Sequence, residues 1–344
     1  MNEDHRIWEQ ISIFESNDFL GKWYTQRHGR GLNAARKREI GSNFTQGREY
    51  FHSAGAAAAS VRPLLLYYGV LSLSRGVILL LDRNKKEENL KPSHGLEVVD
   101  WGATLSDGIE NVLDLRVRAT NGTFGELAYA SKNRQATAWW SAPKMVIGSF
   151  SVEHKWPQFT SDKTVVTLDD LLSRDQRFLS LYERTTGRPT KVHLSEIVAD
   201  GNGVEISVLP TSASARLNFS SAFGLPIDVT VARRENARRL PIPNYFFRLV
   251  GDDRNRLKPT LPVSQYVGND GMFILEDFPN GDRMSELLRT FLISYILGML
   301  VRYFPSRWIG LLRNEKGDVA QPILTAAVNA VERDFPRLVS EALG

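Results

Sequence analysis

Long hydrophobic runs lie near both ends of the chain, and their pattern predicts buried helices. Residues 64–81 are apolar around almost the whole circumference of a helix, with only two serines and Arg75 on a thin polar edge. A helix with that pattern is enclosed by other elements. Residues 285–304 form a second apolar run that stops before Pro305, which cannot continue a helix. We expect both runs to be core helices.

A membrane span is the alternative for these two runs. Residues 61–81 have the length of a span, but Arg75 and Pro63 lie within them, and a charge is costly in lipid. The apolar part of the second run, residues 291–301, is shorter than the roughly 20 residues that a span needs. We therefore expect no transmembrane segment. Acidic residues follow Met1 where a signal peptide carries basic ones, so we expect a cytoplasmic protein.

Capping residues and prolines predict where other helices begin. Asn43, with Gln46 three residues later, has the pattern of a capping box, so we expect a helix to begin there. Pro63 interrupts that helix with a kink or the start of a new one, and Pro322 fits the first turn of a C-terminal helix. A further helix is expected over residues 167–185.

The middle of the chain has the shorter apolar runs that are typical of strands. The turn sequence from Asp200 to Gly203 predicts a hairpin, because its glycines tolerate positive φ. The strand candidates are residues 96–101, 112–118, 191–199, 204–209, 216–219, 227–232, 245–250 and 272–275.

Together these elements predict an α+β fold in which the N- and C-terminal helices pack together and the middle region contains a mainly antiparallel sheet. We expect three parts. Residues 1–96 form an N-terminal helical part, and residues 97–284 form the mixed middle region. Residues 285–344 form a C-terminal helical part that packs on the N-terminal helices.

Composition excludes several kinds of chemistry. The absence of cysteine removes disulfides, zinc–thiolate sites, iron–sulfur clusters and thiol nucleophiles. The sequence has no P-loop, no Gly-x-Ser-x-Gly motif and no histidine pair at the spacing of a zinc protease. We therefore expect no catalytic residue, no metal and no cofactor. The net charge of +4 is too small to predict nucleic-acid binding by itself.

Two local basic clusters are candidate anion-binding sites. Each can attract the phosphates of nucleic acid or of lipid headgroups, although no aromatic residues are interleaved with them and a solvated surface is the favoured interpretation. The first contains Arg27, His28, Arg30, Arg36, Lys37 and Arg38, and the second contains Arg233, Arg234, Arg238 and Arg239.

One short pattern leaves an enzymatic alternative open. Ribonuclease domains of the HEPN type carry an arginine and a histidine with four to six residues between them, and Arg188 with His193 fits that spacing. Pro189 and the strand-like residues nearby oppose the helical placement that such a site needs. A HEPN-like ribonuclease of an abortive-infection system therefore stays an alternative, as does a housekeeping protein with an unknown ligand.

Aromatic, glycine and basic residues near both ends of the chain resemble the signature of a bacterial protein family. The N-terminal block reads RPLLLYYGVLSL and is followed by HGL, and the C-terminal block reads YILGMLVRYF. In this order and spacing they resemble the YaaC-like family. The signature residues are Tyr50, Pro63, Tyr67, Tyr68, Gly69, His94, Gly95, Arg302, Tyr303 and Trp308.

The resemblance implies a role without catalysis. Some members of that family resemble the sensor half of the jumbo phage killer system, a two-protein bacterial immunity system against large, nucleus-forming phages. It implies a non-enzymatic protein that senses early infection and recruits an effector protein encoded nearby, with phage nucleic acid or phage-derived membrane as further partners. Buried tyrosines need hydrogen-bond partners, which His94 or Arg302 can supply. We therefore expect the signature residues to be a polar lock between the terminal helices.

Overall fold

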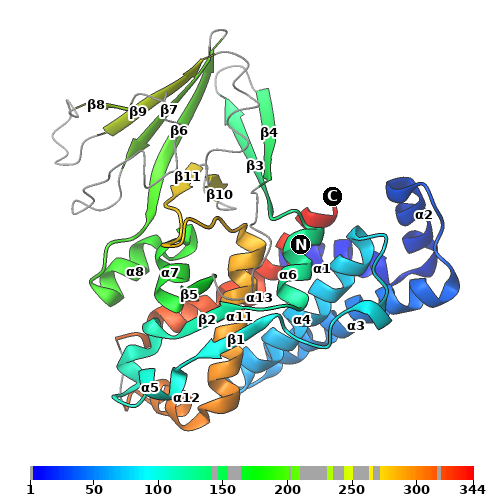
Figure 1. Cartoon of the computed structure of the whole chain (residues 1–344), viewed down its shortest axis with the longest axis horizontal. Helices are drawn as coiled ribbons and strands as arrows, with labels where there is room; N and C mark the ends of the chain where they lie inside the picture. Colours follow the sequence, from blue (N-terminus) through cyan, green and yellow to red (C-terminus); the bar gives the residue numbers. More distant parts are fainter. Residues whose placement is uncertain are drawn as a thin grey trace. The chain divides into compact units, whose positions relative to one another are not determined.

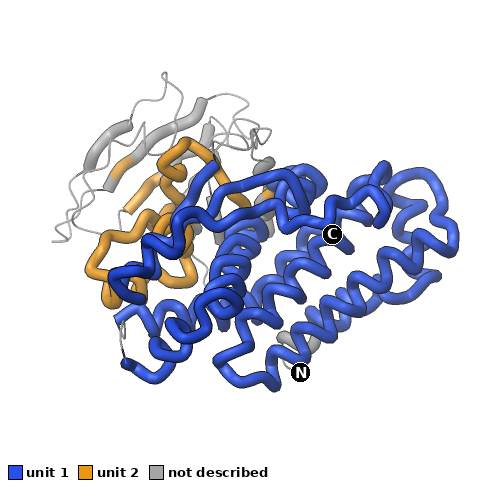
Figure 2. Tube along the Cα trace, turned by 60° about the horizontal axis from the view of Figure 1, so that its bottom comes forward, with its two compact units in different colours: residues 1–133, 157–168, 286–344 blue, residues 134–156, 169–285 orange. Residues whose placement is uncertain are grey.

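The chain folds into two compact units, each described here by itself (Figure 2). Unit 1 comprises residues 1–133, 157–168 and 286–344, and unit 2 comprises residues 134–156 and 169–285. The structure is a computed structural model. It describes residues 3–141, 146–153, 164–200, 203–209, 231–234, 244–250, 263–265, 272–315 and 319–344.

Unit 1 is built from helices of both ends of the chain (Figure 1). Helix α4 packs on α3, α6, α11 and α13, and α1 packs on α13. The predicted association of the terminal helices is therefore confirmed. The helices of unit 1 are α1 (Glu3–Ser12), α2 (Asn17–His28), α3 (Ala34–Ala56), α4 (Arg62–Leu81), α5 (Trp101–Thr104), α6 (Thr123–Ala130), α11 (Glu286–Tyr303), α12 (Pro305–Leu312) and α13 (Gln321–Leu343), with 3-10 turns η1 (Ile13–Glu15), η2 (Glu87–Asn89) and η3 (Ile109–Asp114).

Helices α3 and α4 approach closely because glycines on each helix receive large side chains from the other. A Cβ atom on Gly69 would lie 2.6 Å from the ring of Phe51, and one on Gly47 would lie 2.6 Å from the side chain of Leu73. Both distances are shorter than real Cβ contacts, so the missing side chains are what allow this packing.

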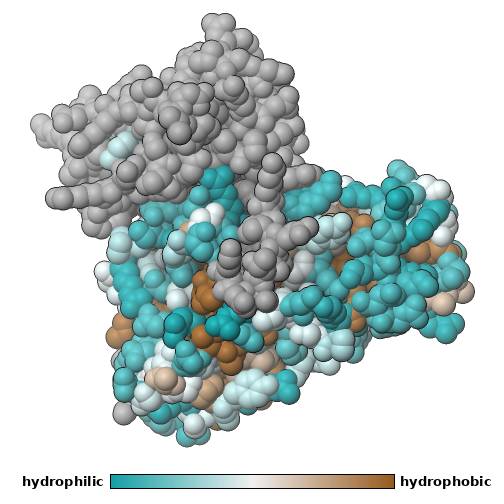
Figure 3. Space-filling view, in the orientation of Figure 1, coloured by the Kyte–Doolittle hydropathy of each residue, from teal (hydrophilic) through white to brown (hydrophobic). Residues whose placement is uncertain are grey.

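The hydrophobicity of α4 is accounted for by burial in unit 1. By length and composition α4 passes the test for a membrane span, as does the pair α11 and α12, which is bent by 104°. The core helix of a soluble protein passes the same test. Most of α4 is buried against its four neighbours, as predicted. Figure 3 shows that hydrophilic residues cover most of the coloured surface, with smaller hydrophobic areas between them.

A small antiparallel sheet completes unit 1. Its strands are β1 (Leu96–Val99), β2 (Arg116–Ala119) and β5 (Val165–Thr167), in the order β1-β2-β5. Trp101 follows β1, is buried, and donates from Nε1 to the carbonyl of Arg116 at 2.7 Å. The strand expected over residues 112–118 begins only at Arg116, because η3 occupies the preceding residues.

Unit 2 contains the larger sheet, and every described strand pair in it is antiparallel, as predicted. The pairing of Asp200 with Gly203 confirms the hairpin, whereas residues 216–219 lie outside the described part. The six-stranded order is β10-β11-β6-β7-β9-β8, and β3 pairs with β4. The elements are β3 (Arg134–Ser141), β4 (Val146–Glu153), α7 (Leu168–Ser173), η4 (Gln176–Phe178), α8 (Leu179–Thr186), β6 (Val192–Asp200), β7 (Gly203–Leu209), β8 (Val231–Arg234), β9 (Asn244–Val250), β10 (Val263–Gln265) and β11 (Met272–Leu275).

The capping-box prediction at Asn43 is wrong. Helix α3 begins earlier, after the N-cap Asn33, whose side chain accepts from the amide of Arg36 at 2.9 Å. Asn43 lies inside the helix and donates to the carbonyl of Glu39 at 2.8 Å, and Gln46 bonds to a serine of α4. A side chain that bonds one turn back along the helix has the same sequence pattern as a cap.

The single helix expected over residues 167–185 is instead two helices, α7 and α8. Between them the buried carboxylate of Asp175 accepts a hydrogen bond from the amide of Arg177 at 3.0 Å and starts the short turn η4. Gly187 ends α8 at φ +66.

Candidate functional site

Tyr67 and His94 form the centre of the signature residues. Tyr67 projects from α4 and is fully buried, and its hydroxyl lies 2.5 Å from Nδ1 of the half-buried His94. Burial raises the pKa of Tyr67, so the phenol keeps its proton. Burial, with the charge of Arg302, lowers the pKa of His94. The lowered pKa favours the neutral imidazole, which carries one proton on its two ring nitrogens.

Helix α11 meets this pair through Tyr295 and Gly298. The ring of Tyr295 lies 5.5 Å from that of Tyr67 and 5.9 Å from that of His94. Its hydroxyl donates to the carbonyl of Leu96 at 3.1 Å, and burial raises the pKa of Tyr295 to about 12. A Cβ on Gly298 would lie 2.7 Å from the Cβ of Tyr67, so this glycine makes room for the tyrosine.

The backbone of His94 and Gly95 joins the same region to α6. The carbonyl of His94 accepts from the amide of Phe124 at 3.0 Å, which gives a partner to a first-turn amide of α6. Gly95 has φ +76, and a Cβ there would lie 2.8 Å from the carbonyl carbon of Gly122. The signature glycine is thus required both by its positive φ and by the contact of two backbones.

Arg302 and its aromatic neighbours form the exposed edge of the site. Arg302 Nη1 donates to the hydroxyl of Tyr68 at 3.4 Å, and the guanidinium lies 5.2 Å from the centre of the Tyr303 ring. Tyr303 is 57% exposed, and Tyr50 lies against Tyr68 with ring centres 5.6 Å apart. This edge therefore combines one cation with three phenol rings.

The other signature residues shape helix ends and contacts. Pro63 occupies the first turn of α4, and Trp308 of α12 donates from Nε1 to the carbonyl of Ala59 at 3.1 Å. Gly69 receives Phe51, as described above. All ten signature residues therefore lie in unit 1, and eight of them are in helices that pack on one another.

Comparison with known proteins agrees with this arrangement. The family model described as YaaC-like protein matches residues 12–343. The chain belongs to the YaaC-like family. No curated protein and no solved structure matches it. In this YaaC-like chain the family resemblance therefore extends over both helical ends and the middle region.

Part of the first basic cluster caps the C-terminal end of α4. Arg36 is buried and donates to the carbonyl of Leu79 at 3.4 Å as well as to Glu39 at 2.6 Å. His28 Nε2 donates to the carbonyl of Leu80 at 2.8 Å, and Arg30 bonds to a carbonyl just beyond the helix. Cations favour a helix C-terminus, where the last carbonyls have no partner within the helix. These three residues of the YaaC-like chain are therefore structural.

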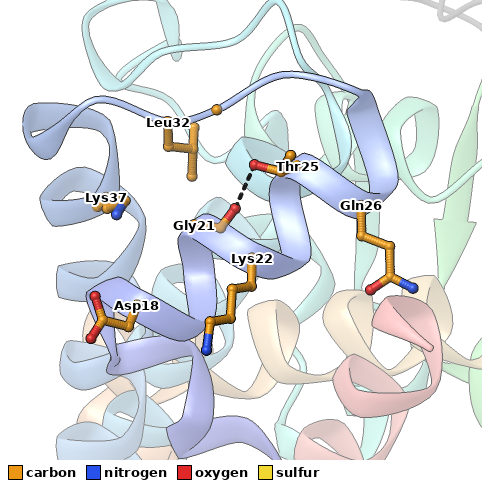
Figure 4. A pocket seen from close by; sticks show the side chains of 8 residues that line it. Asp18, Gly21, Lys22, Thr25, Gln26, Leu32 and Lys37 are labelled. Carbon is orange, nitrogen blue, oxygen red and sulfur yellow. Dashed lines mark hydrogen bonds between the residues drawn. The ribbon is translucent and has the colours of Figure 1, made fainter.

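Of the remaining cations of that cluster, Lys37 lines a mixed-charge hollow between α2 and α3 (Figure 4). The Lys37 ammonium lies against Gly21, and Asp18 lines the same hollow. Arg27 lies 5.6 Å from the ring of Trp23, and Arg38 is exposed. In the second cluster Arg238 and Arg239 lie outside the described residues, and only the backbone of Arg233 and Arg234, in β8, is described.

The Arg-x4-His pattern does not lie on a helix. Arg188 follows the end of α8 and donates to Asp169 at 2.7 Å, whereas His193 lies on β6 with 0% exposure and its Nε2 is 3.0 Å from Glu276. Burial alone raises the pKa of Glu276, but the His193 hydrogen bond and nearby Lys191 hold it below its ordinary value. His193 is therefore a buried histidine that is hydrogen-bonded to a carboxylate. Within the described ranges, no group of three metal-ligating side chains is found.

Proposed function

We propose that this chain is a non-enzymatic protein of bacterial anti-phage defence, which senses an early event of infection and recruits a separate effector protein. Membership of the YaaC-like family supports the proposal, because some members resemble the sensor half of the jumbo phage killer system. In this proposal the effector is encoded by a neighbouring gene, the chain acts in the cytoplasm, and phage nucleic acid or phage-derived membrane supplies the signal.

The hydrogen bond between Tyr67 and His94 is the observation that best supports a role without catalysis. A nucleophile or general base must reach a substrate, and it is activated by an adjacent acid or base. Here the phenol is buried, its raised pKa disfavours the nucleophilic phenolate, and it occupies Nδ1 of the imidazole. Among the described residues, no carboxylate bonds to His94. These side chains join segments of unit 1.

Phage infection tests the proposal. Four strains would carry the chain with its neighbouring gene, the chain alone, the neighbouring gene alone, or neither. Plaque titres of a nucleus-forming phage are expected to fall only in the first strain. Unchanged titres in that strain would contradict the proposal.

A second experiment distinguishes the sensor hypothesis from the ribonuclease hypothesis. Arg188→Gln removes the arginine of the HEPN-like pattern from a partly exposed ion pair. The sensor proposal expects this variant to protect like wild type and expects purified chain to leave RNA intact. Cleavage of RNA by the wild type, abolished in Arg188→Gln, would support the enzyme instead.

A further inference from the structure

The hollow between α2 and α3 follows one face of α2 (Figure 4). Its volume is about 720 Å³, which lies in the range of ligand pockets. The residues of α2 that line it recur at the spacing of a single helix face, and they are Asp18, Gly21, Lys22, Thr25 and Gln26. Because each helical residue rises about 1.5 Å, this face is about 12 Å long, or about two helical turns. The connecting loop and the beginning of α3 supply Gly31, Leu32 and Lys37.

Gly21 makes room for the ammonium group of Lys37 beside the hollow. A Cβ atom on Gly21 would lie 2.9 Å from Nζ of Lys37 and 3.0 Å from its Cε. An alanine at this position would therefore displace the ammonium, at little cost because the end of a lysine side chain is flexible. Within the described ranges, the half-buried Lys37 forms no ion pair and no side-chain hydrogen bond. Its three N–H donors at the side of a hollow favour an anionic ligand.

The segment that surrounds the hollow is strongly basic. Residues 17–39 carry six lysines and arginines against two acids, and one of these acids, Glu39, is paired with Arg36. Lys22 and Arg38 are exposed, and neither forms an ion pair in the part of the chain that the structure describes. This surface is therefore complementary in charge to a partner that carries several anionic groups.

The lining favours an acidic protein segment over a nucleic acid. Proteins that bind single strands stack the bases on aromatic side chains, and none of the described residues that line the hollow is aromatic. Trp23 of α2 packs on Phe14 instead, and Arg27 lies over its ring. Asp18 in the lining repels phosphates, whereas Leu32 offers an apolar contact to a side chain of a partner.

We propose that the hollow between α2 and α3 binds an acidic amphipathic segment of the effector protein. One carboxylate of that segment pairs with the Lys37 ammonium, an apolar side chain packs on Leu32, and a further carboxylate faces Lys22. The inference rests on the proposed function, for which it supplies the surface that recruits the effector. Its assay needs no phage, so a chain that protects cells but binds no acidic segment contradicts this inference alone.

Fluorescence anisotropy at low salt tests the site. The probe is a fluorescein-labelled peptide of about 14 residues, or about four helical turns, in which glutamate and leucine repeat at helical spacing. The same peptide with glutamine in place of glutamate and an oligothymidylate of the same length are the comparison probes. The wild type is expected to bind the acidic peptide and neither of the other two.

Two variants test the position of the ammonium. Lys37→Gln is expected to weaken binding of the acidic peptide about threefold to tenfold, as for a partly exposed ion pair. Gly21→Ala keeps every charge but displaces the ammonium, so it is expected to weaken binding at least about threefold. Its melting temperature is expected to equal or exceed that of the wild type, because alanine is the better helix former.

Two further variants are matched controls. A Cβ at Gly102 meets nothing within 4 Å, so Gly102→Ala adds the same methyl group in open space. Arg313→Gln removes a positive charge from a side chain that is 71% exposed. Both are expected to bind the peptide within about twofold of the wild type. The inference is wrong if the wild type does not bind the acidic peptide, if Gly21→Ala binds as tightly as the wild type, or if oligothymidylate binds more tightly than the peptide.

Discussion

The hydroxyl of Tyr67 lies 2.5 Å from Nδ1 of His94, which joins the N-terminal half of α4 to the loop that precedes β1. Tyr295 of α11 contacts both rings. Segments from both ends of the chain therefore meet at one hydrogen bond in the interior of unit 1. The predictions below test whether this contact and its neighbours stabilise the fold.

His94 is expected to make stability depend on pH. Because burial and Arg302 lower its pKa in the folded state, the unfolded chain binds the proton more readily, and the contribution of neutral His94 is present above the ordinary pKa of 6.5. It is lost as the pH falls below that value toward the folded pKa. Urea unfolding at about pH 8 and about pH 5 measures the loss. His94→Gln is expected to reduce it, while the exposed control His52→Gln leaves it unchanged.

Gly298→Ala is expected to destabilise unit 1 by about 1–3 kcal/mol, because the new methyl would lie 2.7 Å from the Cβ of Tyr67. Chemical denaturation measures the change. Gly310→Ala in α12 is the matched control, since its nearest contact is at an ordinary 3.4 Å. Alanine is the better helix former, so this control is expected to be neutral or slightly stabilising. Equal effects of the two substitutions would rule out the packing argument.

Gly95→Ala is expected to destabilise the chain more than Gly29→Ala. Both glycines have positive φ, but nothing lies within 4 Å of a Cβ at Gly29, whereas a Cβ at Gly95 would lie 2.8 Å from Gly122. Gly29→Ala is therefore expected to cost about 1 kcal/mol of backbone strain, and Gly95→Ala at least about 1 kcal/mol more. Melting temperatures of the two variants give the comparison, and the reverse order would contradict it.

Arg36→Gln is expected to lower stability by about 1–2 kcal/mol, because Arg36 serves the C-terminal carbonyls of α4. The exposed Arg38→Gln is expected to change it by less than about 0.5 kcal/mol. Unfolding curves at low salt provide the test. A loss of anion binding in Arg36→Gln without a loss of stability would show that Arg36 faces a ligand instead.

The fold class was predictable from the sequence because it depends on long hydrophobic patterns. Residues 62–81 are apolar around almost the whole helix, which predicts a buried core helix. The second apolar run ends before Pro305, which predicts where the second core helix ends. The start of α3 was not predictable from capping patterns. Asn33 and Asn43 are both asparagines in a helical context, and only the tertiary structure shows that Asn43 bonds back within the helix.

The candidate site was predictable only as a set of residue types. Buried tyrosines require partners, which pointed to His94 and Arg302, but Tyr295 was missed as a member because its role depends on its contact with Tyr67. The role of Arg36 was missed for the same reason. Its proximity to Arg27 and Arg38 in the sequence suggested an anion site, whereas its partner Leu79 belongs to another helix.

A double-mutant cycle on Tyr67 and His94 tests most directly whether the signature residues hold unit 1 together. Free energies of unfolding in urea would be measured for wild type, Tyr67→Phe, His94→Gln and the double variant. We expect each single variant to be destabilised and the pair to show a coupling of about 0.5–1.5 kcal/mol. If the changes in unfolding free energy of the two single variants are additive, the structural role is contradicted. It is also contradicted if the single variants are as stable as wild type but no longer protect cells against phage.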